Sequence, residues 1–519
     1  MSKNDWNKMN ESDFESALID TLSQTPPDDI IKQVNPWRRA MRFVIIGIAL
    51  NVVTLNFLLL NYILPTIGII LTLLGFRTLR NENIWFKRCY SITVMKTVYL
   101  IIVYTVESTI YRNNIFESNF SWMISIIPVM LSFSLFICLW NALRTVRSKV
   151  GLTSNAAPVA ALIVWYIILC FLALIQYVGI IILLCMIVAY VLILRNLFRL
   201  SRELDDAGYT IEASPVKMSD TALSVTVIAI LVLLMLLGTA FGSNYPMEWQ
   251  PYEVSDTKET SEIKLHLIEL GFPEEILDDL TEEDLLACQG ALRVVVDMND
   301  HSLNKGRLET VYKDGEPFEL MEPGYYSTIV YDVKELRITG IGVELPGKRE
   351  TWKIFHHFCW VHDPGYRGTV ALQLWPAYRN INNGWMSDGG EISGRLLYNS
   401  DGKVYTAPYY RLKQETYTRD TIFLGQYKST DVFAEFSMPK DGEKHRGYLS
   451  YSILENKDGW IIDAWINYIH QTSPLQFPVL TAKQSRIQNA WNDDSAFKLI
   501  QDALQFFPTE NDSGLITND

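Results

Sequence analysis

The sequence predicts a polytopic α-helical membrane domain of seven spans, followed by an α+β, mainly antiparallel-β extracytoplasmic domain built as a sandwich or a curled sheet. Three observations predict this architecture. Uncharged apolar runs recur up to Thr221–Phe241, whose 21 residues reach about 30 Å as a helix, the thickness of a bilayer core. Basic residues collect at alternate ends of these runs. After residue 241 the chain has the composition of a soluble domain.

Charge divides between the two parts of the chain. Residues 1–241 hold 19 Lys+Arg and 15 Asp+Glu, whereas residues 242–519 hold 26 and 43, so the net charges are +4 and −17. An acidic soluble part argues against nucleic-acid binding, because phosphate contacts need clustered basic residues. We interpret the acid excess as a solvated, repulsive surface.

The predicted segments follow from these shifts in composition. Met1–Asn35 is polar and acidic, without the basic and apolar regions of a cleaved signal peptide, and Ser12 is expected to cap a short helix within it. The predicted segments are a cytoplasmic tail at 1–42, a membrane domain at 43–241, a linker at 242–258, a short helical module at 259–290, a β-rich domain at 291–480, and a C-terminal helix and tail at 481–519.

The number of spans rests on charge. The uncharged run Phe43–Phe76 is too long for one span, and Asn61–Pro65 is expected to break it into spans at roughly 43–60 and 62–77. Two further pairs and the single span Thr221–Phe241 follow. Fourteen Lys/Arg then fall at inner flanks and only Arg112 in an outer loop. By the positive-inside rule, the N-terminus is cytoplasmic and the C-terminal domain extracytoplasmic in the cell membrane.

The C-terminal part begins with short helices. Gly271 is expected to end the first of them, and Thr281 with Asp284 resembles a capping box. Alternating β-branched and aromatic residues then predict strands, bounded by Gly, Pro and Asp. They cover 292–298, 307–313, 326–332, 335–344, 352–362, 369–375, 392–398, 404–408, 447–454 and 460–470. The Asp-Gly pairs at 401 and 458 are expected to join neighbouring strands, and Phe497, Ile500 and Leu504 to face the sheet from a final helix.

Histidines and cysteines gather in one predicted strand. His357 and Cys359 would point to one face of it, and His356 to the other together with Phe358 and Trp360. His357 and Cys359 are candidate metal ligands if a distant residue joins them, although no HExxH or CxxC spacing supports a site. The alternative is an aromatic-rich strand. No catalytic residue and no cofactor is predicted, because nucleophile-elbow and phosphate-loop motifs are absent.

Aromatic and polar residues mark a candidate ligand site. Rings beside amide and carboxylate groups suit a saccharide or peptide, through stacking and hydrogen bonds. The same composition is typical of the edges of a β-sandwich. The candidate residues are Trp375, Tyr378, Trp385, Asp388, Tyr409 and Tyr410.

Two charged residues, Lys96 and Glu107, lie within the third predicted span. They are about 16 Å apart along a helix, too far to pair. We expect both to reach the membrane interface from positions near the span ends.

Three segments carry a resemblance to known sequences: PPDDIIKQVNPWRRAM at Pro26–Met41, ALRVVVDMNDH at Ala291–His301 and DAWINYIHQ at Asp463–Gln471. They resemble an uncharacterised group of bacterial multi-span membrane proteins with a large extracytoplasmic C-terminal domain. The resemblance implies the architecture and brings no activity and no functional residues.

The sequence therefore predicts an integral membrane protein that works without catalysis, as a sensor, receptor or envelope-interaction protein. Its partners would be the lipid bilayer and an extracytoplasmic ligand or protein; the oligomeric state stays open. The alternatives are a transport-related membrane subunit and a membrane-tethered extracytoplasmic hydrolase. Cys288 and Cys359 are expected to be unpaired, because nothing in the sequence places them close together.

Overall fold

The computed structural model describes most of the chain, in segments. They are residues 36–52, 59–116, 121–175, 179–211, 217–253, 257–313, 324–375, 381–421, 425–474, 476–488 and 496–508. The helix expected in the N-terminal tail and Tyr378 lie outside them. The chain divides into two compact units, a helical unit (Met1–Thr105 and Asn113–Met235) and a β-rich unit (Val106–Arg112 and Leu236–Asp519).

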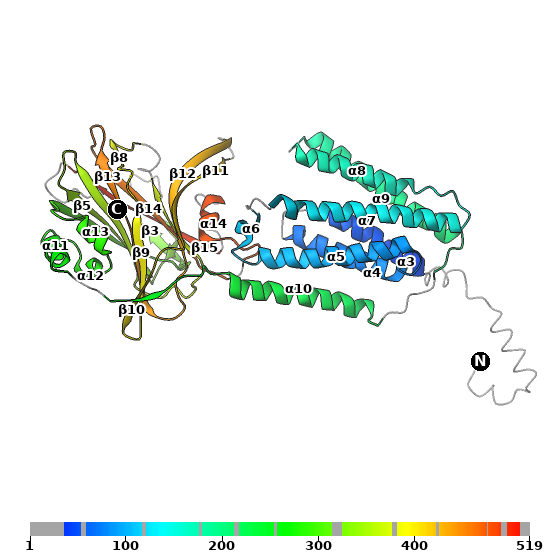
Figure 1. The fold of residues 1–519 in the computed structure, drawn as a ribbon, viewed down its shortest axis with the longest axis horizontal. Helices are drawn as coiled ribbons and strands as arrows, with labels where there is room; N and C mark the ends of the chain where they lie inside the picture. The colour runs from blue at the N-terminus through cyan, green and yellow to red at the C-terminus, as the bar shows by residue number, and fades with distance from the viewer. Residues whose placement is uncertain are drawn as a thin grey trace, which may run out of the picture. The chain divides into compact units, whose positions relative to one another are not determined.

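Long helices account for the apolar runs of the sequence (Figure 1). They are α3 (Pro36–Val52), α4 (Leu60–Leu79), α5 (Ile84–Glu107), α7 (Ser121–Lys149), α8 (Ala157–Leu174), α9 (Ile180–Asp206) and α10 (Asp220–Gly242), with the short α6 (Arg112–Phe116) after α5. Among the described residues, six helices are long and apolar enough to cross a membrane: α4, α5, α7, α8, α9 and α10. The protein is therefore membrane-associated. The helix α3 has 17 residues in the described part and is not among these six.

The contact between α3 and α4 depends on glycine. A Cβ atom on Gly47 would lie 2.3 Å from Oγ1 of Thr72, and one on Gly68 would lie 2.8 Å from the Gly47 carbonyl oxygen. Two helices can approach this closely only where small residues face each other, as is common between membrane helices. Leu59, the residue before α4, has a φ of 58°.

The run Phe43–Phe76 is divided between two helices as expected, α3 and α4, but the expected position of the break at Asn61–Pro65 is wrong, because these residues form the start of α4. Pro65 is the sixth residue of α4, beyond the first-turn amides that lack intrahelical partners, so it removes the bond that an amide at this position would give to the Asn61 carbonyl oxygen. The Thr66 hydroxyl also donates to the Tyr62 carbonyl oxygen at 2.8 Å.

The expected inner flanks meet at one end of the helical unit. Asp220, at the start of α10, accepts from Arg39 at 3.0 Å and from Arg77 at 2.7 Å. Two further pairs join helix ends that carry predicted inner-flank residues, Arg147–Glu203 at 3.0 Å and Lys149–Glu82 at 2.8 Å. The alternation of basic flanks in the sequence thus corresponds to helices that run up and down.

The β-rich unit holds two large antiparallel sheets and a hairpin. An 8-stranded sheet has the order β1-β10-β9-β13-β6-β5-β2, with β8 beside β13, and a 5-stranded sheet has the order β11-β12-β7-β14-β15. The hairpin is formed by β3 and β4. The strands are β1 (Gln250–Tyr252), β2 (Arg293–His301), β3 (Arg307–Lys313), β4 (Gly324–Val330), β5 (Leu336–Leu345), β6 (Thr351–Trp360), β7 (Val370–Trp375), β8 (Trp385–Ser387), β9 (Ser393–Ser400), β10 (Lys403–Ala407), β11 (Arg411–Thr421), β12 (Gly425–Phe436), β13 (Glu443–Glu455), β14 (Ile462–Gln471) and β15 (Phe497–Phe506).

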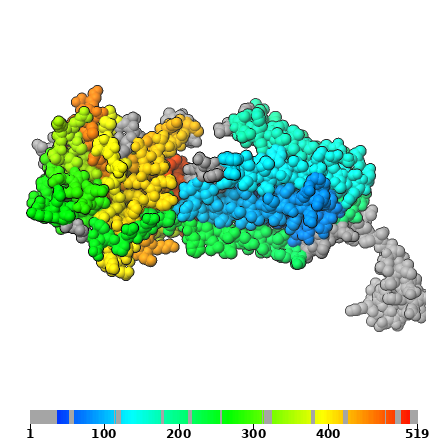
Figure 2. Space-filling model, in the orientation of Figure 1, coloured from blue at the N-terminus to red at the C-terminus, as the bar shows by residue number. Residues whose placement is uncertain are grey.

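The two large sheets share one hydrophobic core, and helices cover their other faces. Alternate residues of β6, including Ile354 and Phe358, pack with Leu372 and Ile466 of the 5-stranded sheet. On its other face, the 8-stranded sheet packs against α11 (Lys258–Glu269), α12 (Glu274–Leu277) and α13 (Glu282–Leu286). Figure 2 shows this segment, in green, as a continuous surface of the β-rich unit. The short helix α14 (Ala482–Gln488) covers β7, β14 and β15.

Most expected elements of this unit are confirmed. Each expected strand overlaps an observed one, and their ends differ by at most four residues. Asp401 and Gly402, with φ of 50° and 71°, form the expected turn between the paired strands β9 and β10. Gly271 ends α11 with φ of 95°, and the Thr281 side chain caps α13.

Two expectations at the C-terminal end are wrong. Residues 497–506 form β15, paired along its whole length with β14, and not a helix. The spacing of Phe497, Ile500 and Leu504 suits a helix, but residues 500, 502, 504 and 506 are buried in strict alternation. The Asp458-Gly459 turn does not close a hairpin, because the strands it joins, β13 and β14, belong to different sheets.

Candidate functional site

The candidate site lies on the face of the 8-stranded sheet that packs against α11–α13. Strand register creates it, because Arg337 of β5, Cys359 of β6 and Arg446 of β13 are directly opposite one another. Thr339 and His357 are opposite in a neighbouring row. Side chains at such positions point to the same face of a sheet. They surround a cavity of about 250 Å³, lined by Glu275, Ile276, Asp279, Met298, Arg337, Thr339, His357, Cys359, Val361, Asn399, Lys444 and Arg446.

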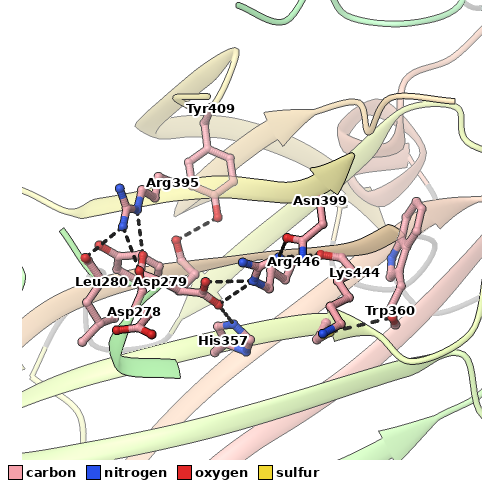
Figure 3. Close-up of polar contacts among 12 residues, drawn as sticks. Asp278, Asp279, Leu280, His357, Trp360, Arg395, Asn399, Tyr409, Lys444 and Arg446 are labelled. Atoms are coloured by element: carbon pink, nitrogen blue, oxygen red, sulfur yellow. Dashed lines mark hydrogen bonds and ion pairs between the residues drawn. The ribbon is translucent and has the colours of Figure 1, made fainter. Parts of the chain in front are cut away.

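Asp279 is the centre of the polar contacts in this cavity. Its carboxylate, 2% exposed, accepts from Nε2 of His357 at 3.0 Å and from Nε of Arg446 at 2.8 and 2.9 Å. Figure 3 shows both side chains directed at it. Burial alone would raise the pKa of Asp279, but the hydrogen bonds and charges of His357 and Arg446 outweigh burial and hold that pKa below its usual value. Asp279 is therefore ionised at neutral pH.

The loop that carries Asp279 is fixed by a second arginine. Arg395 of β9 donates from Nε to the Asp279 carbonyl oxygen at 2.7 Å and from Nη2 to those of Asp278 and Leu280 at 3.3 and 2.9 Å (Figure 3). Its guanidinium lies 4.0 Å from the ring centroid of Tyr252. The carboxylate is thus held in place by its own backbone as well as by its partners.

Cationic side chains outnumber carboxylates in the lining of the cavity, although Asp300 beside the lining pairs with Arg337. Arg337, Lys444 and Arg446 face two acids, Glu275 and Asp279. Arg337 is bound to Asp300 through Nε and Nη2, and Arg446 binds Asp279 through Nε.

Some of the donors around the cavity have no partner in the described part of the chain. They are Nζ of Lys444, Nη1 of Arg337 and Nη2 of Arg446, and the Thr339 hydroxyl joins them on the wall. An anion would satisfy such donors.

Cys359 lies in the cavity wall without the environment of a nucleophile. Burial raises the pKa of its thiol, and Asp279 adds to this, although Arg446 acts in the opposite direction. Its described hydrogen bond goes to the Trp360 carbonyl oxygen at 3.7 Å. The thiol is therefore protonated at neutral pH, and the arrangement favours binding over thiolate chemistry. Cys359 and Cys288 are both free.

The structure separates the aromatic residues expected to bind a ligand. Trp385 and Tyr409 are buried in the core between the sheets, 2% and 7% exposed. Trp375 stacks on Trp465 of β14, with ring centroids 5.9 Å apart, and Tyr410 stacks on Tyr245 at 4.5 Å.

No described ring contact joins any two of these candidate residues. Asp388 is exposed, and its carboxylate accepts from the Gly390 amide at 2.8 Å. A saccharide or peptide site on these residues stays a prediction.

The remaining candidates also have defined positions. His357 and Cys359 share a face of β6 as expected, opposite to His356. Among the described residues no group of three His, Cys, Asp or Glu side chains is arranged to hold a metal ion. Glu107 ends α5, where its carbonyl oxygen accepts from the Val479 amide at 2.8 Å.

Lys96 contradicts the expectation that it reaches the membrane interface. It lies halfway along α5, and its ammonium group binds Ser132 inside the helical unit.

Asp279 was not among the residues expected at a site. In the sequence it lies in an acidic stretch that suggests a solvated surface. The sequence offers one signal, the position of Asp279 between Leu277 and Leu280, which are both buried in the structure. A carboxylate flanked by apolar residues is often buried with them, and it then needs a cationic partner. Its partners are 78 and 167 residues away along the chain, so local patterns do not reveal them.

Comparisons with known proteins add little. No protein-family model and no curated protein sequence matches the chain. A solved structure described as "Pore forming protein" is similar over 39% of this chain and 96% of that chain, at 9% sequence identity and a TM-score of 0.15. A similarity at this level carries no argument about fold or function.

Proposed function

We propose that this membrane-associated protein is a receptor or sensor whose β-rich unit binds a small anionic ligand at the cavity around Asp279. In this proposal seven helices, α3 included, span the cell membrane of a bacterium, the N-terminus is cytoplasmic, and the β-rich unit is an extracytoplasmic sandwich. The alternation of basic flanks supports this orientation.

One observation carries the choice of ligand: cationic side chains with free donor groups line a cavity of about 250 Å³ in a part of the chain with a net charge of −17. A cavity lined by three cationic side chains in so acidic a unit favours a carboxylate or phosphate group. Ile276, Met298 and Val361 supply an apolar wall for a short organic part. The volume suits a molecule of about the size of an amino acid.

The test is isothermal titration of the full chain in detergent with succinate and with inorganic phosphate. These two probes distinguish carboxylate from phosphate recognition. We expect Lys444→Ala to weaken binding of the preferred probe by about 10- to 100-fold, the effect of losing one charge-assisted hydrogen bond. Lys403→Ala, an exposed lysine at the start of β10, is the matched control and should leave the affinity unchanged. Absence of binding by both probes, or equal losses in both variants, would refute the proposal.

Orientation is tested separately by protease treatment of intact cells, with an antibody against the C-terminus. Release of a fragment of roughly the mass of residues 242–519 supports an extracytoplasmic β-rich unit. Protection in cells together with cleavage in inverted vesicles would place that unit in the cytoplasm and would remove the receptor proposal.

A further inference from the structure

A second cavity lies inside the helical unit, between α3, α4, α5, α7 and α8. Its volume is about 160 Å³. It is lined by Ile48, Asn51, Val52, Ile69, Thr72, Lys96, Ser132, Leu135, Phe136, Tyr166 and Leu169. At about 30 Å³ per molecule, roughly five waters would fill it. The lining is apolar except for five polar side chains, those of Asn51, Thr72, Lys96, Ser132 and Tyr166. These five side chains therefore determine which molecules the cavity can bind.

Lys96 provides the charge in this cavity. It lies halfway along α5, so about 17 Å of helix separates it from either end, a distance that a lysine side chain does not span. Its Nζ atom is 3.0 Å from Oγ of Ser132, which itself donates to the Pro128 carbonyl oxygen at 2.7 Å. Ser132 therefore accepts from the ammonium group, and further N–H donors remain on Lys96.

No carboxylate balances this charge among the residues that the structure describes around the cavity. Thr72 donates its hydroxyl to the Gly68 carbonyl oxygen at 2.7 Å, and Asn51 donates one amide N–H to that of Gly47 at 2.8 Å. The second N–H of Asn51 remains a donor in the lining of the same cavity. A cation in an apolar region of a membrane protein is costly unless a counter-charge or polar partners meet it.

We propose that this cavity binds a small monovalent inorganic anion, of the class of chloride, bromide or nitrate, with Lys96 as its counter-charge. Three features select this class. The site offers N–H donors around one positive charge, its walls are apolar, and its volume excludes an organic anion with more than a few heavy atoms beside residual water. The site is separate from the cavity around Asp279, and neither proposal depends on the other.

The test is ³⁵Cl NMR line broadening by the full chain in detergent at pH 7, with gluconate as the replacing anion at constant ionic strength. We expect excess broadening that saturates and that bromide displaces. Lys96→Met should raise the apparent Kd for chloride by about 10-fold or more, the effect of losing one charge-assisted contact at a partly buried site. Lys87→Met, an exposed lysine on the same helix, is the matched control and should keep the wild-type Kd.

Two further results keep the proposal open to refutation if Lys96→Met fails to fold. Lys96→Arg keeps the charge and should keep displaceable broadening, whereas Asn51→Leu removes only a neutral donor and should weaken binding several-fold. The proposal is overturned if the wild-type chain shows no saturable broadening, because the lysine is then neutral or solvated by water alone. Equal loss in Lys87→Met also overturns it, since binding then reflects surface charge.

Discussion

Three buried histidines make the β-rich unit sensitive to acid. His356, His445 and His470 are 1%, 3% and 0% exposed. Burial lowers the pKa of His356 to about 3 and those of His445 and His470 to about 4, from an ordinary value of 6.5. All three are neutral in the folded protein at neutral pH. His470 donates from Nε2 to the Tyr366 carbonyl oxygen at 3.0 Å, which fixes its tautomer.

The direction of the effect follows from proton linkage. Below pH 6.5 the unfolded chain takes up protons at these histidines, whereas the folded chain does so only near pH 4, so acid favours unfolding. Each pH unit of acidification in this window lowers the free energy of unfolding by about 1.4 kcal/mol per histidine. At pH 5 the free energy of unfolding is lower by about 2 kcal/mol through His470 alone, and by at most about 6 kcal/mol through all three histidines. Typical domain stabilities are about 5–15 kcal/mol, so the loss is large.

The buried carboxylates Asp279 and Asp284 do not interfere in this window. Desolvation raises the pKa values of Asp279 and Asp284, but nearby cations and hydrogen bonds lower them more, so both pKa values fall below 3.8. The stability that these two groups contribute is fully present above about pH 5 and is lost only as the pH falls through their folded-state pKa values.

The assay is urea denaturation of the full chain in detergent between pH 7.5 and pH 5, followed by tryptophan fluorescence. His470→Gln keeps an N–H donor for the Tyr366 carbonyl oxygen but does not titrate, so its stability should change with pH by about one third less than that of wild type. His362→Gln, at an exposed histidine, should match wild type. A wild-type stability that is flat between pH 6.5 and pH 5, or an unchanged slope in His470→Gln, would refute this reasoning.

Three further predictions concern packing and buried polar groups. Asp279→Ala should destabilise the β-rich unit by about 2–4 kcal/mol, because the partly buried Arg446 and the buried His357 lose their partner, whereas Asp300→Ala breaks a pair of side chains that are each 39% exposed and should cost at most about 1 kcal/mol in the same urea assay. Gly47→Leu should separate α3 from α4 and lower the temperature at which the chain aggregates in detergent, since even a Cβ atom has no room there. Tyr448→Phe removes a 2.7 Å hydrogen bond to the carboxylate of Asp284 and should cost about 1.5–3 kcal/mol of unfolding free energy; no change in urea midpoint would contradict this.

Local patterns were sufficient where one physical constraint decides the structure. Uncharged runs form helices because backbone groups in a bilayer must pair within the segment. Alternation placed His357 and Cys359 on one face of β6, and Asp401-Gly402 marked a hairpin since both residues adopt positive φ. Such features depend on a few neighbouring residues, so the sequence contains them.

The sequence did not reveal pairings between distant segments. Phe497, Ile500 and Leu504 fit a helical face as well as they fit a strand, and the open edge of β14 decided the outcome. The turn at Asp458 has the local chemistry of a hairpin, yet the chain changes sheet there. In both cases the competing structures differ in which partner strand is available, and that is a property of the whole fold.

The candidate site shows the same limit for polar residues. Hydropathy assigns Asp279, Asp284 and Glu435 to the surface, yet all three are 5% exposed or less. Asp279 and Asp284 bind Arg446 and Lys353 across the boundary between the α11–α13 layer and the 8-stranded sheet. Burying such pairs is costly and adds little net stability, but it permits only one position of the helices on the sheet. We infer that these pairs fix the helical layer, and the cavity proposed to bind an anion lies beside one of them, at Asp279.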